Sequence, residues 1–351
     1  MKNNSKYTVG SLYAGIGGIC LGFEQASFQL KWANDNDLPA CKTYRTNFNH
    51  QIHNDSIQDL DPQTFEPVDI ITSGFPCQAF SVAGYQKGFD DPRGNYFFET
   101  MNFINTLKPK AFLLENVKNL ETHDKGNTIK VIKESIKASG YSFQSAILNT
   151  KDYGGIPQTR ERIYIVGFRG EASSNPNEEL CSKHFTFPSK VQLNTNIHDF
   201  LDEEVDYKKF YYDETFMNGN KTNSNDKGKY LKILQNEITN PDTIYQWRRV
   251  YVRENKNNLC PTLTANMGTG GHNVPLIRDN IGIRKLTPRE CARFQGFPDT
   301  FLLPGFDNTT NKSESNSLGQ LYKQIGNSVS VPVIERIANC LKQALNSKYR
   351  V

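Results

Sequence analysis

Strand-like and helix-like segments alternate through the first half of the chain. In residues 7–35, two β-like stretches enclose a glycine turn and a short helix-like segment. Farther along, apolar residues recur at helical spacing from Phe97 to Leu107, and Pro109 ends that pattern. Such alternation predicts an α/β fold with a parallel, doubly wound sheet over about residues 1–170. The expected strands are 7–13, 28–35, 110–117, 141–149 and 162–168, and the expected helices are 19–27, 91–109, 128–140 and 331–345.

The regular pattern ends near residue 170. Residues 171–283 show no clear periodicity and contain the polar, low-complexity stretch NGNKTNSNDKGKY. A second, smaller and irregular domain is expected there. We place one domain at 1–185 plus 319–351, and the second, with its hinge, at 186–318.

Charge and cysteine usage narrow the class of protein. From Val205 to Gln295 there are 15 Lys/Arg against 9 Asp/Glu, a local net charge of +6 within a chain of +4. This distribution suits contact with a polyanion, although a solvated lysine-rich surface has the same composition. Seven cysteines without a CxxC pair disfavour a disulfide framework or a zinc site, so no metal is expected. Lacking an apolar run of about 20 residues or a signal peptide, the chain is expected in the cytoplasm, with no membrane partner.

The glycine turn YAGIGG, from Tyr13 to Gly18, lies between a strand and a helix. Glycines there let the main chain approach a ligand closely, but one such turn alone is weak evidence. Asp35, 17 residues after Gly18, stands where a ribose-binding carboxylate belongs. Asp55 follows the next strand-like segment and suits an adenine amino group. The GxGG spacing disfavours a pyrophosphate, so S-adenosylmethionine, which has adenosine without phosphate, fits better.

A thiol and a carboxyl follow two apolar strand-like runs. Cys77 comes directly after Pro76 at the end of VDIITSGF, and Glu115 ends the run KAFLLENV. If both strands are parallel, the two groups emerge at one sheet edge, which suggests nucleophilic and acid catalysis. A buried cysteine that acts as a small hydrophobe and a strand-end acid that caps a turn are the simpler interpretations.

Two arginines, Arg160 and Arg162, stand two residues apart in QTRERIYIVGF. We expect them on one face of a strand entry, where two guanidiniums hold carboxylates and base carbonyls. A surface salt bridge is the alternative.

In order, these segments resemble the bacterial DNA (cytosine-5)-methyltransferases. The resemblance covers almost the whole chain and six motifs: YAGIGG, GFPCQAFS, FLLENV, QTRERIYIVGF, RKLTPRECARFQGFP and QIGNSVSVPV. Phe75, Tyr13 and Asn36 depart from it, where many relatives have a proline, a phenylalanine and an aromatic residue respectively. None of the three departures touches the chemistry.

The resemblance implies a Rossmann-like, S-adenosylmethionine-dependent methyltransferase sheet with a target-recognition domain, and it implies roles for individual residues. Cys77 is the nucleophile, and Pro76 stiffens its approach. Glu115 is the acid beside Asn116, and Arg160 and Arg162 shape the cytosine pocket. The cofactor-binding residues are Tyr13, Gly15, Gly17, Gly18, Asp35, Asp55 and Asn327. The DNA-contacting candidates are Thr262, Leu263, Arg248 and Arg249.

The implied reaction explains why these residue types are needed. C5 of cytosine becomes nucleophilic only after a thiolate adds at C6 with a proton at N3, and the base must first leave the duplex. The partner is double-stranded DNA, and the enzyme is expected to be monomeric. Two alternatives stay open: a modification enzyme with a cognate restriction endonuclease encoded nearby, or an orphan or phage-borne enzyme.

Three other functions remain open at this stage. An RNA (tRNA) cytosine-5 methyltransferase of the same fold would share the chemistry, but the CFT tripeptide of such relatives is absent. A non-catalytic DNA reader would not need Cys77 and Glu115. A small-molecule methyltransferase would not need the second, basic domain.

Overall fold

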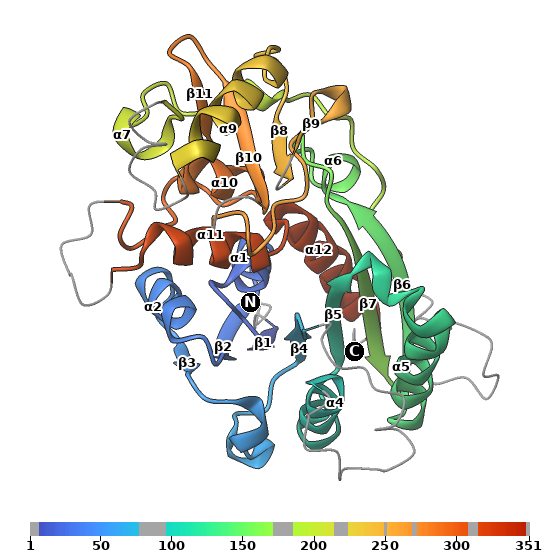
Figure 1. Ribbon diagram of the computed structural model, residues 1–351. Helices are drawn as coiled ribbons and strands as arrows, with labels where there is room; N and C mark the ends of the chain where they lie inside the picture. Colours follow the sequence, from blue (N-terminus) through green and yellow to red (C-terminus); the bar gives the residue numbers. More distant parts are fainter. Residues whose placement is uncertain are drawn as a thin grey trace, which may run out of the picture. The chain divides into compact units, whose positions relative to one another are not determined.

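The computed structural model describes residues 7–76, 96–170, 185–213, 224–248, 251–268, 272–307 and 315–348. The chain divides into two compact units (Figure 1). Unit 1 comprises Met1–Asn149, Glu161–Lys190 and Val331–Val351, and unit 2 comprises Thr150–Arg160 and Val191–Ser330. The boundary that we expected at residues 185/186 and 318/319 stays a prediction. None of the helices in these ranges is both long and apolar enough to cross a membrane.

The described part of unit 1 is built on a seven-stranded sheet in the order β3-β2-β1-β4-β5-β7-β6. Its strands are β1 (Thr8–Leu12), β2 (Gln29–Asn34), β3 (Gln51–His53), β4 (Ile70–Ser73), β5 (Ala111–Val117), β6 (Tyr141–Asn149) and β7 (Glu161–Arg169). The pairs from β3 to β5 are parallel, as the alternating sequence predicts. The α/β fold class is therefore confirmed for this unit.

Strand β7 differs from the expectation of a parallel sheet, because it pairs antiparallel with both β5 and β6. Two parallel neighbouring strands need a long crossover connection between them, whereas two antiparallel neighbours need only a short loop. Between β6 and β7 the chain has only residues 150–160, with the four-residue helix α6 (Thr150–Tyr153). The short connection therefore accounts for the reversed strand.

Helices cover both faces of this sheet. The described helices of unit 1 are α1 (Gly18–Gln25), α2 (Leu38–Asn47), α4 (Tyr96–Leu107), α5 (Asn127–Ala138) and α12 (Val331–Lys348). Phe97 and Ile104 of α4 share one buried cluster with Ile132 and Ile136 of α5. Helix α1 contacts β1 and β2, and α12 packs against α1. The helical spacing predicted from Phe97 to Leu107 is confirmed.

Unit 2 contains more regular structure than its sequence suggests. A four-stranded antiparallel sheet has the order β11-β10-β8-β9. The strands of this sheet are β8 (Tyr245–Arg248), β9 (Tyr251–Glu254), β10 (His272–Arg278) and β11 (Ile283–Lys285). In addition to α6, the described helices of unit 2 are α7 (Tyr207–Phe210), α9 (Ser224–Glu237), α10 (Pro288–Phe294) and α11 (Leu318–Asn327). Leu234, Ile238 and Tyr245 belong to the apolar cluster on this sheet. The strands are short, and Pro275 interrupts the β-like pattern of β10, so periodicity alone did not reveal them.

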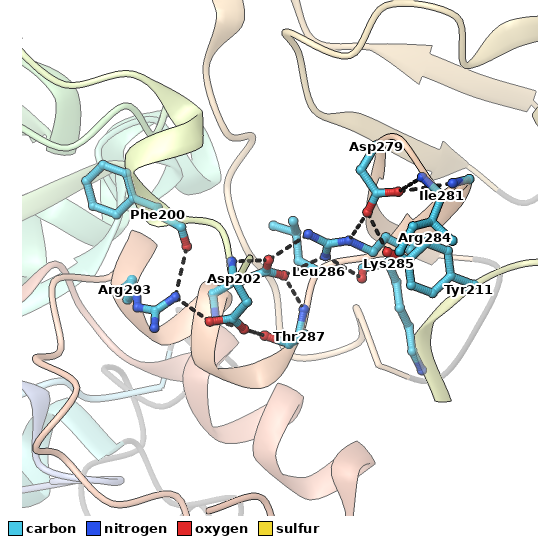
Figure 2. Close-up of polar contacts among 12 residues, drawn as sticks. Phe200, Asp202, Tyr211, Asp279, Ile281, Arg284, Lys285, Leu286, Thr287 and Arg293 are labelled. Atoms are coloured by element: carbon cyan, nitrogen blue, oxygen red, sulfur yellow. Dashed lines mark hydrogen bonds and ion pairs between the residues drawn. The ribbon is translucent and has the colours of Figure 1, made fainter. Parts of the chain in front are cut away.

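A buried ionic network joins β11 to α10 in unit 2 (Figure 2). The Arg284 guanidinium donates from Nη1 and Nη2 to the two carboxylate oxygens of Glu290 at 2.9 and 2.8 Å. Arg284 Nε also donates to Asp279 Oδ2 at 2.7 Å. Thr287 caps α10, because its hydroxyl accepts from Glu290 N while the Glu290 carboxylate accepts from Thr287 N. The motif RKLTPREC is therefore held by buried charge pairing.

Candidate active site

The glycine turn after β1 adopts left-handed main-chain conformations. The φ angles are 53° at Tyr13, 56° at Gly15 and 94° at Gly17. A Cβ built on Gly17 would lie 2.2 Å from Phe48, so only glycine fits there. At Gly15, by contrast, no atom of the described residues lies within 4 Å of such a Cβ. The main chain at Gly15 therefore faces open space in which a ligand can approach.

Two carboxylates follow the neighbouring strands β2 and β3. Asp35 accepts hydrogen bonds from Gly15 N at 2.7 Å and from Asp37 N at 2.8 Å, one on each oxygen. Each carboxylate oxygen has two acceptor sites, and a ribose hydroxyl is a matching donor. Asp55 is exposed, and its main-chain oxygen accepts from the buried amide of Asn34 at 2.9 Å. Sequence reasoning missed Asn34, whose signal was an amide directly after the apolar residues Trp32 and Ala33 at the end of β2.

These groups suit an adenosine that carries an amino acid. Gly18 begins α1, and the Gly17 N-cap makes no side-chain capping bond. The helix N-terminus favours a carboxylate, and the carboxylates of Asp35 and Asp55 are acceptors for ribose and adenine donors. The residues present therefore fit S-adenosylmethionine.

The Tyr13 side chain connects the glycine turn to α4. Its hydroxyl donates to Tyr96 O at 3.0 Å, and the two rings meet edge to face with centroids 5.8 Å apart. Burial, together with the nearby Glu99 carboxylate, raises the pKa of the Tyr13 phenol well above its ordinary value. The phenol therefore stays protonated and keeps donating to the first residue of α4.

Glu115 lies at the carboxyl end of β5, where its side chain is almost buried. Ser73 of β4 pairs with Leu114, so Gly74 follows beside Glu115. Glu115 Oε1 is 3.2 Å from Arg162 Nε, and the side chains are only 11% and 14% exposed respectively. Glu115 Oε2 is 3.7 Å from the position of a Cβ on Gly74. The two oxygens thus have different surroundings: Oε1 lies against Arg162, and Oε2 lies near the main chain at Gly74, which leads to Pro76.

Asn116 holds the chain that leads away from β4. Its Nδ2 donates to Phe75 O at 2.8 Å, and its side chain is buried. Pro76, the next residue, is exposed. The predicted nucleophile Cys77 lies outside the described residues, as does Arg249. The structure thus brings Glu115, Arg162, Asn116 and Pro76 to one sheet edge and follows the chain to the residue before Cys77.

Arg160 does not share the surroundings of Arg162, although the sequence predicted one face for both. Arg162 belongs to β7 in unit 1, whereas Arg160 precedes β7 and belongs to unit 2. The Arg160 side chain is 2% exposed, and its Nη1 donates to Leu263 O at 2.9 Å. The physical reason is that strand alternation applies only inside a strand, and β7 begins at Glu161.

The remaining predicted residues also lie in unit 2. Asn327 ends α11 and is exposed. Thr262 is partly buried, and its hydroxyl donates to Thr159 O at 2.5 Å, while Leu263 is 1% exposed. Arg248 is partly buried in β8, with Nη2 3.0 Å from Gln246 Oε1. In this structure the Leu263 side chain packs in the interior, and the DNA-contacting roles stay predictions.

Comparison with known protein families identifies the family of this chain. The model of the family "C-5 cytosine-specific DNA methylase" matches residues 7–343. The chain belongs to this family. Among its relatives, the Type II methyltransferase M.Bsp6I of Bacillus sp. (strain RFL6) is 49% identical over 341 residues, which cover 96% of this chain and 99% of the relative. The Type II methyltransferase M.HhaI of Haemophilus parahaemolyticus is 36% identical over 344 residues, covering 96% and 94% respectively.

Solved structures agree on the fold. The crystal structure of a Spodoptera frugiperda DNMT2 variant has a TM-score of 0.67 at 21% identity and covers 97% of this chain and 100% of its own. The S. pombe Dnmt2 methyltransferase has a TM-score of 0.67 at 19% identity, with 98% and 99% covered. As a C-5 cytosine-specific DNA methylase, the chain is an enzyme that uses S-adenosylmethionine to methylate cytosine C5 in DNA.

Proposed function

We propose that this enzyme methylates a flipped-out cytosine within a specific double-stranded DNA sequence, through a covalent bond between Cys77 and C6. The observation that carries the proposal is the place of Glu115. Its carboxylate lies at the end of β5, where Arg162 holds one oxygen. The other oxygen lies near Gly74, which is three residues before Cys77 in the sequence. A base that enters at this strand edge would meet a thiol and a carboxyl together.

Each residue then has a defined task. The Cys77 thiolate adds to C6, and a proton shared between N3 and the Glu115 carboxyl balances the charge that develops on the ring. Arg162 holds the Glu115 carboxylate in place through Oε1. Asn116, through its bond to Phe75 O, fixes the main chain just before Pro76 and Cys77. S-adenosylmethionine, when bound, supplies an electrophilic methyl group. Loss of the C5 proton to water and departure of the Cys77 thiolate, with the N3 proton returned to Glu115, restore the aromatic ring.

The cofactor would be held by the glycine turn and by the strand-end acids. Gly15 offers open main chain, and Asp35 and Asp55 offer acceptors for the ribose and adenine. Tyr13, Gly17, Gly18 and Asn327 complete the proposed set, and Asn327 is exposed.

The second domain, which we place at residues 186–318, would bind the DNA. The basic excess from Val205 to Gln295, inside this domain, suits phosphates, and base-edge contacts would supply sequence specificity. The proposed contacts are Thr262, Leu263, Arg248 and Arg249.

The test of the covalent step uses a duplex with 5-fluorocytosine at the target. With fluorine in place of the C5 hydrogen, no proton can leave C5 after methyl transfer. The unmodified enzyme should therefore stay covalently attached to the DNA, and the complex should appear as a denaturation-resistant band. Cys77→Ala should abolish this band. A band that persists in the variant would remove Cys77 from the reaction.

The test of the substrate uses methyl-labelled S-adenosylmethionine with double-stranded DNA, with tRNA, or with neither. Label in DNA alone supports the proposal, and label in tRNA alone would replace it with the RNA function. Bisulfite sequencing of DNA from cells that express the enzyme then identifies the methylated sequence.

We also propose that the enzyme protects its host DNA as the modification partner of a restriction endonuclease encoded nearby. The Type II designation of the relatives supports this role. The enzyme would act as a monomer in the cytoplasm, where bacterial DNA lies. Cells that carry the gene should yield DNA resistant to that endonuclease, and sensitive DNA would contradict the role.

A further inference from the structure

Arg160 is surrounded by main-chain carbonyls from two segments that are far apart in the sequence. Its Nη1 donates to Leu263 O at 2.9 Å, and its Nη2 donates to Gly326 O at 3.3 Å and also to Ser328 O. The side chain is 2% exposed. A guanidinium has five donors in a fixed planar fork, so one Arg160 side chain sets the spacing of both segments.

The segment around Leu263 is also paired with the chain that carries Arg160. Thr159 N donates to Cys260 O at 2.8 Å, and Cys260 N donates to Pro157 O at 2.6 Å. The Thr262 hydroxyl adds a bond to Thr159 O. The stretch from 260 to 263 is therefore aligned against residues 157–160, with Arg160 at the end of the pairing.

The segment around Gly326 touches the same stretch directly. A Cβ built on Gly326 would lie 2.2 Å from the carbonyl carbon of Thr264 and 2.6 Å from Ala265 N. Real Cβ atoms do not approach main chain so closely, so a glycine is needed at 326. The main chain at Gly326 and the main chain after Leu263 thus lie in contact and share one cation.

Each segment carries a residue of the proposed function. Thr262 lies in the proposed DNA-contacting stretch, and Asn327 is a proposed cofactor ligand. We infer that Arg160 is a positioning residue that fixes the DNA-contacting stretch and the Asn327 turn together, and that it does not touch the cytosine. The inference rests on the proposed function for the roles of Thr262 and Asn327.

The decisive variant is Arg160→Lys, which keeps the charge but loses the planar fork. We expect cofactor binding measured by calorimetry without DNA to weaken about 10-fold, since charge-assisted bonds that order Asn327 are lost. KM for DNA should rise as well, while kcat at saturating substrates should stay near that of the unmodified enzyme. A residue that contacts the cytosine would show the opposite pattern, with a lower kcat and unchanged cofactor affinity in the absence of DNA, and that result would overturn the inference.

Two further variants sharpen this comparison. Gly326→Ala forces the Thr264 main chain away and should raise both the dissociation constant of the cofactor and the KM for DNA. Arg336→Lys is the matched control, because Arg336 also donates to a main-chain carbonyl, Ser189 O, but at a partly exposed position outside the site. It should change neither constant.

A measurement on the unmodified enzyme covers the case in which the variants do not fold. In hydrogen–deuterium exchange, S-adenosylmethionine added without DNA should slow exchange in peptides that cover 325–328 and also in those that cover 260–264. Slowing confined to 325–328, or absent from both, would refute the coupling. Failure of the proposed function would appear separately, as an unmodified enzyme that neither binds the cofactor nor labels DNA.

Discussion

Glu290→Gln should strongly destabilise unit 2. The Glu290 side chain is completely buried, and its carboxylate accepts four hydrogen bonds. Oε1 accepts from Arg284 Nη2 at 2.8 Å and from Asp202 N at 2.9 Å, and Oε2 accepts from Arg284 Nη1 at 2.9 Å and from Thr287 N at 2.7 Å. Glutamine keeps the shape, but its amide group must then face two donors.

The magnitude follows from the burial of both partners. Removing one partner of a buried ion pair costs about 3–5 kcal/mol, because the other charge stays buried without compensation. Asp279, 2.7 Å from Arg284 Nε, still neutralises part of that charge, so we expect about 3 kcal/mol. With a urea dependence of about 1–3 kcal/mol per molar, the unfolding midpoint of unit 2 should fall by roughly 1–3 M.

The chain offers a separate fluorescent reporter for each unit. It has two tryptophans, Trp32 in β2 of unit 1 and Trp247 in β8 of unit 2. In a Trp32→Phe background, Trp247 fluorescence during urea unfolding reports on unit 2 alone. The control is Asp299→Asn, which removes the carboxylate that pairs with Arg293. Because the Asp299 side chain is 65% exposed, this variant should lower the free energy of unfolding by less than about 1 kcal/mol.

The apolar double variant Arg284→Met/Glu290→Leu tests the cause. Buried ion pairs replaced by apolar residues of similar volume often lose little stability. This variant should therefore recover much of what Glu290→Gln loses. A Glu290→Gln effect as small as that of Asp299→Asn would refute the argument from burial. A double variant as unstable as the single variant would refute uncompensated charge as the cause.

Three further outcomes are expected. Asp35→Ala should weaken S-adenosylmethionine binding about 10- to 150-fold, because charge-assisted bonds contribute about 1.5–3 kcal/mol, and calorimetric titration measures it. Tyr13→Phe, the residue of many relatives, removes only the bond to α4 and should lower the free energy of unfolding of unit 1 by about 0.5–1.5 kcal/mol, measured by Trp32 fluorescence. Burial alone would raise the pKa of Asp69, but bonds from Lys110 and Thr8 outweigh it and hold the pKa below its ordinary value. Asp69→Asn should therefore cost most stability above the unfolded pKa of about 3.9, and the cost should vanish as the pH falls through the folded value.

The alternation of strands and helices in unit 1 was predictable because burial imposes it locally. Apolar residues from Phe97 to Ile104 recur at helical spacing, and they bury one face of α4. Glu115 was predictable in position because β4 and β5 are parallel, so their carboxyl ends meet at one edge. Its pairing with Arg162 was not predictable, because it depends on β7 entering the sheet antiparallel to β5.

The sheet of unit 2 escaped prediction for a different reason. Its strands are three to seven residues long, and the apolar side that packs on α9 is supplied by a few residues such as Tyr245, Val252 and Leu276. Such short runs resemble loops when read one at a time. Only the pairing of segments far apart in the sequence, such as β8 with β10, makes them strands.

Arg160 shows where reasoning from spacing fails in physical terms. Residues two apart share a face only when both lie in one strand, and β7 begins at Glu161. The boundary between the units also falls between residues 160 and 161. The motif QTRER therefore crosses from one unit to the other, and its two arginines stabilise different structures. Arg162 serves the carboxyl end of the large sheet, whereas Arg160 serves the main chain around Leu263 and Gly326. Two neighbouring motif arginines can thus have separate tasks, one at the Glu115 carboxyl and one in fixing the main chain around Leu263 and Gly326.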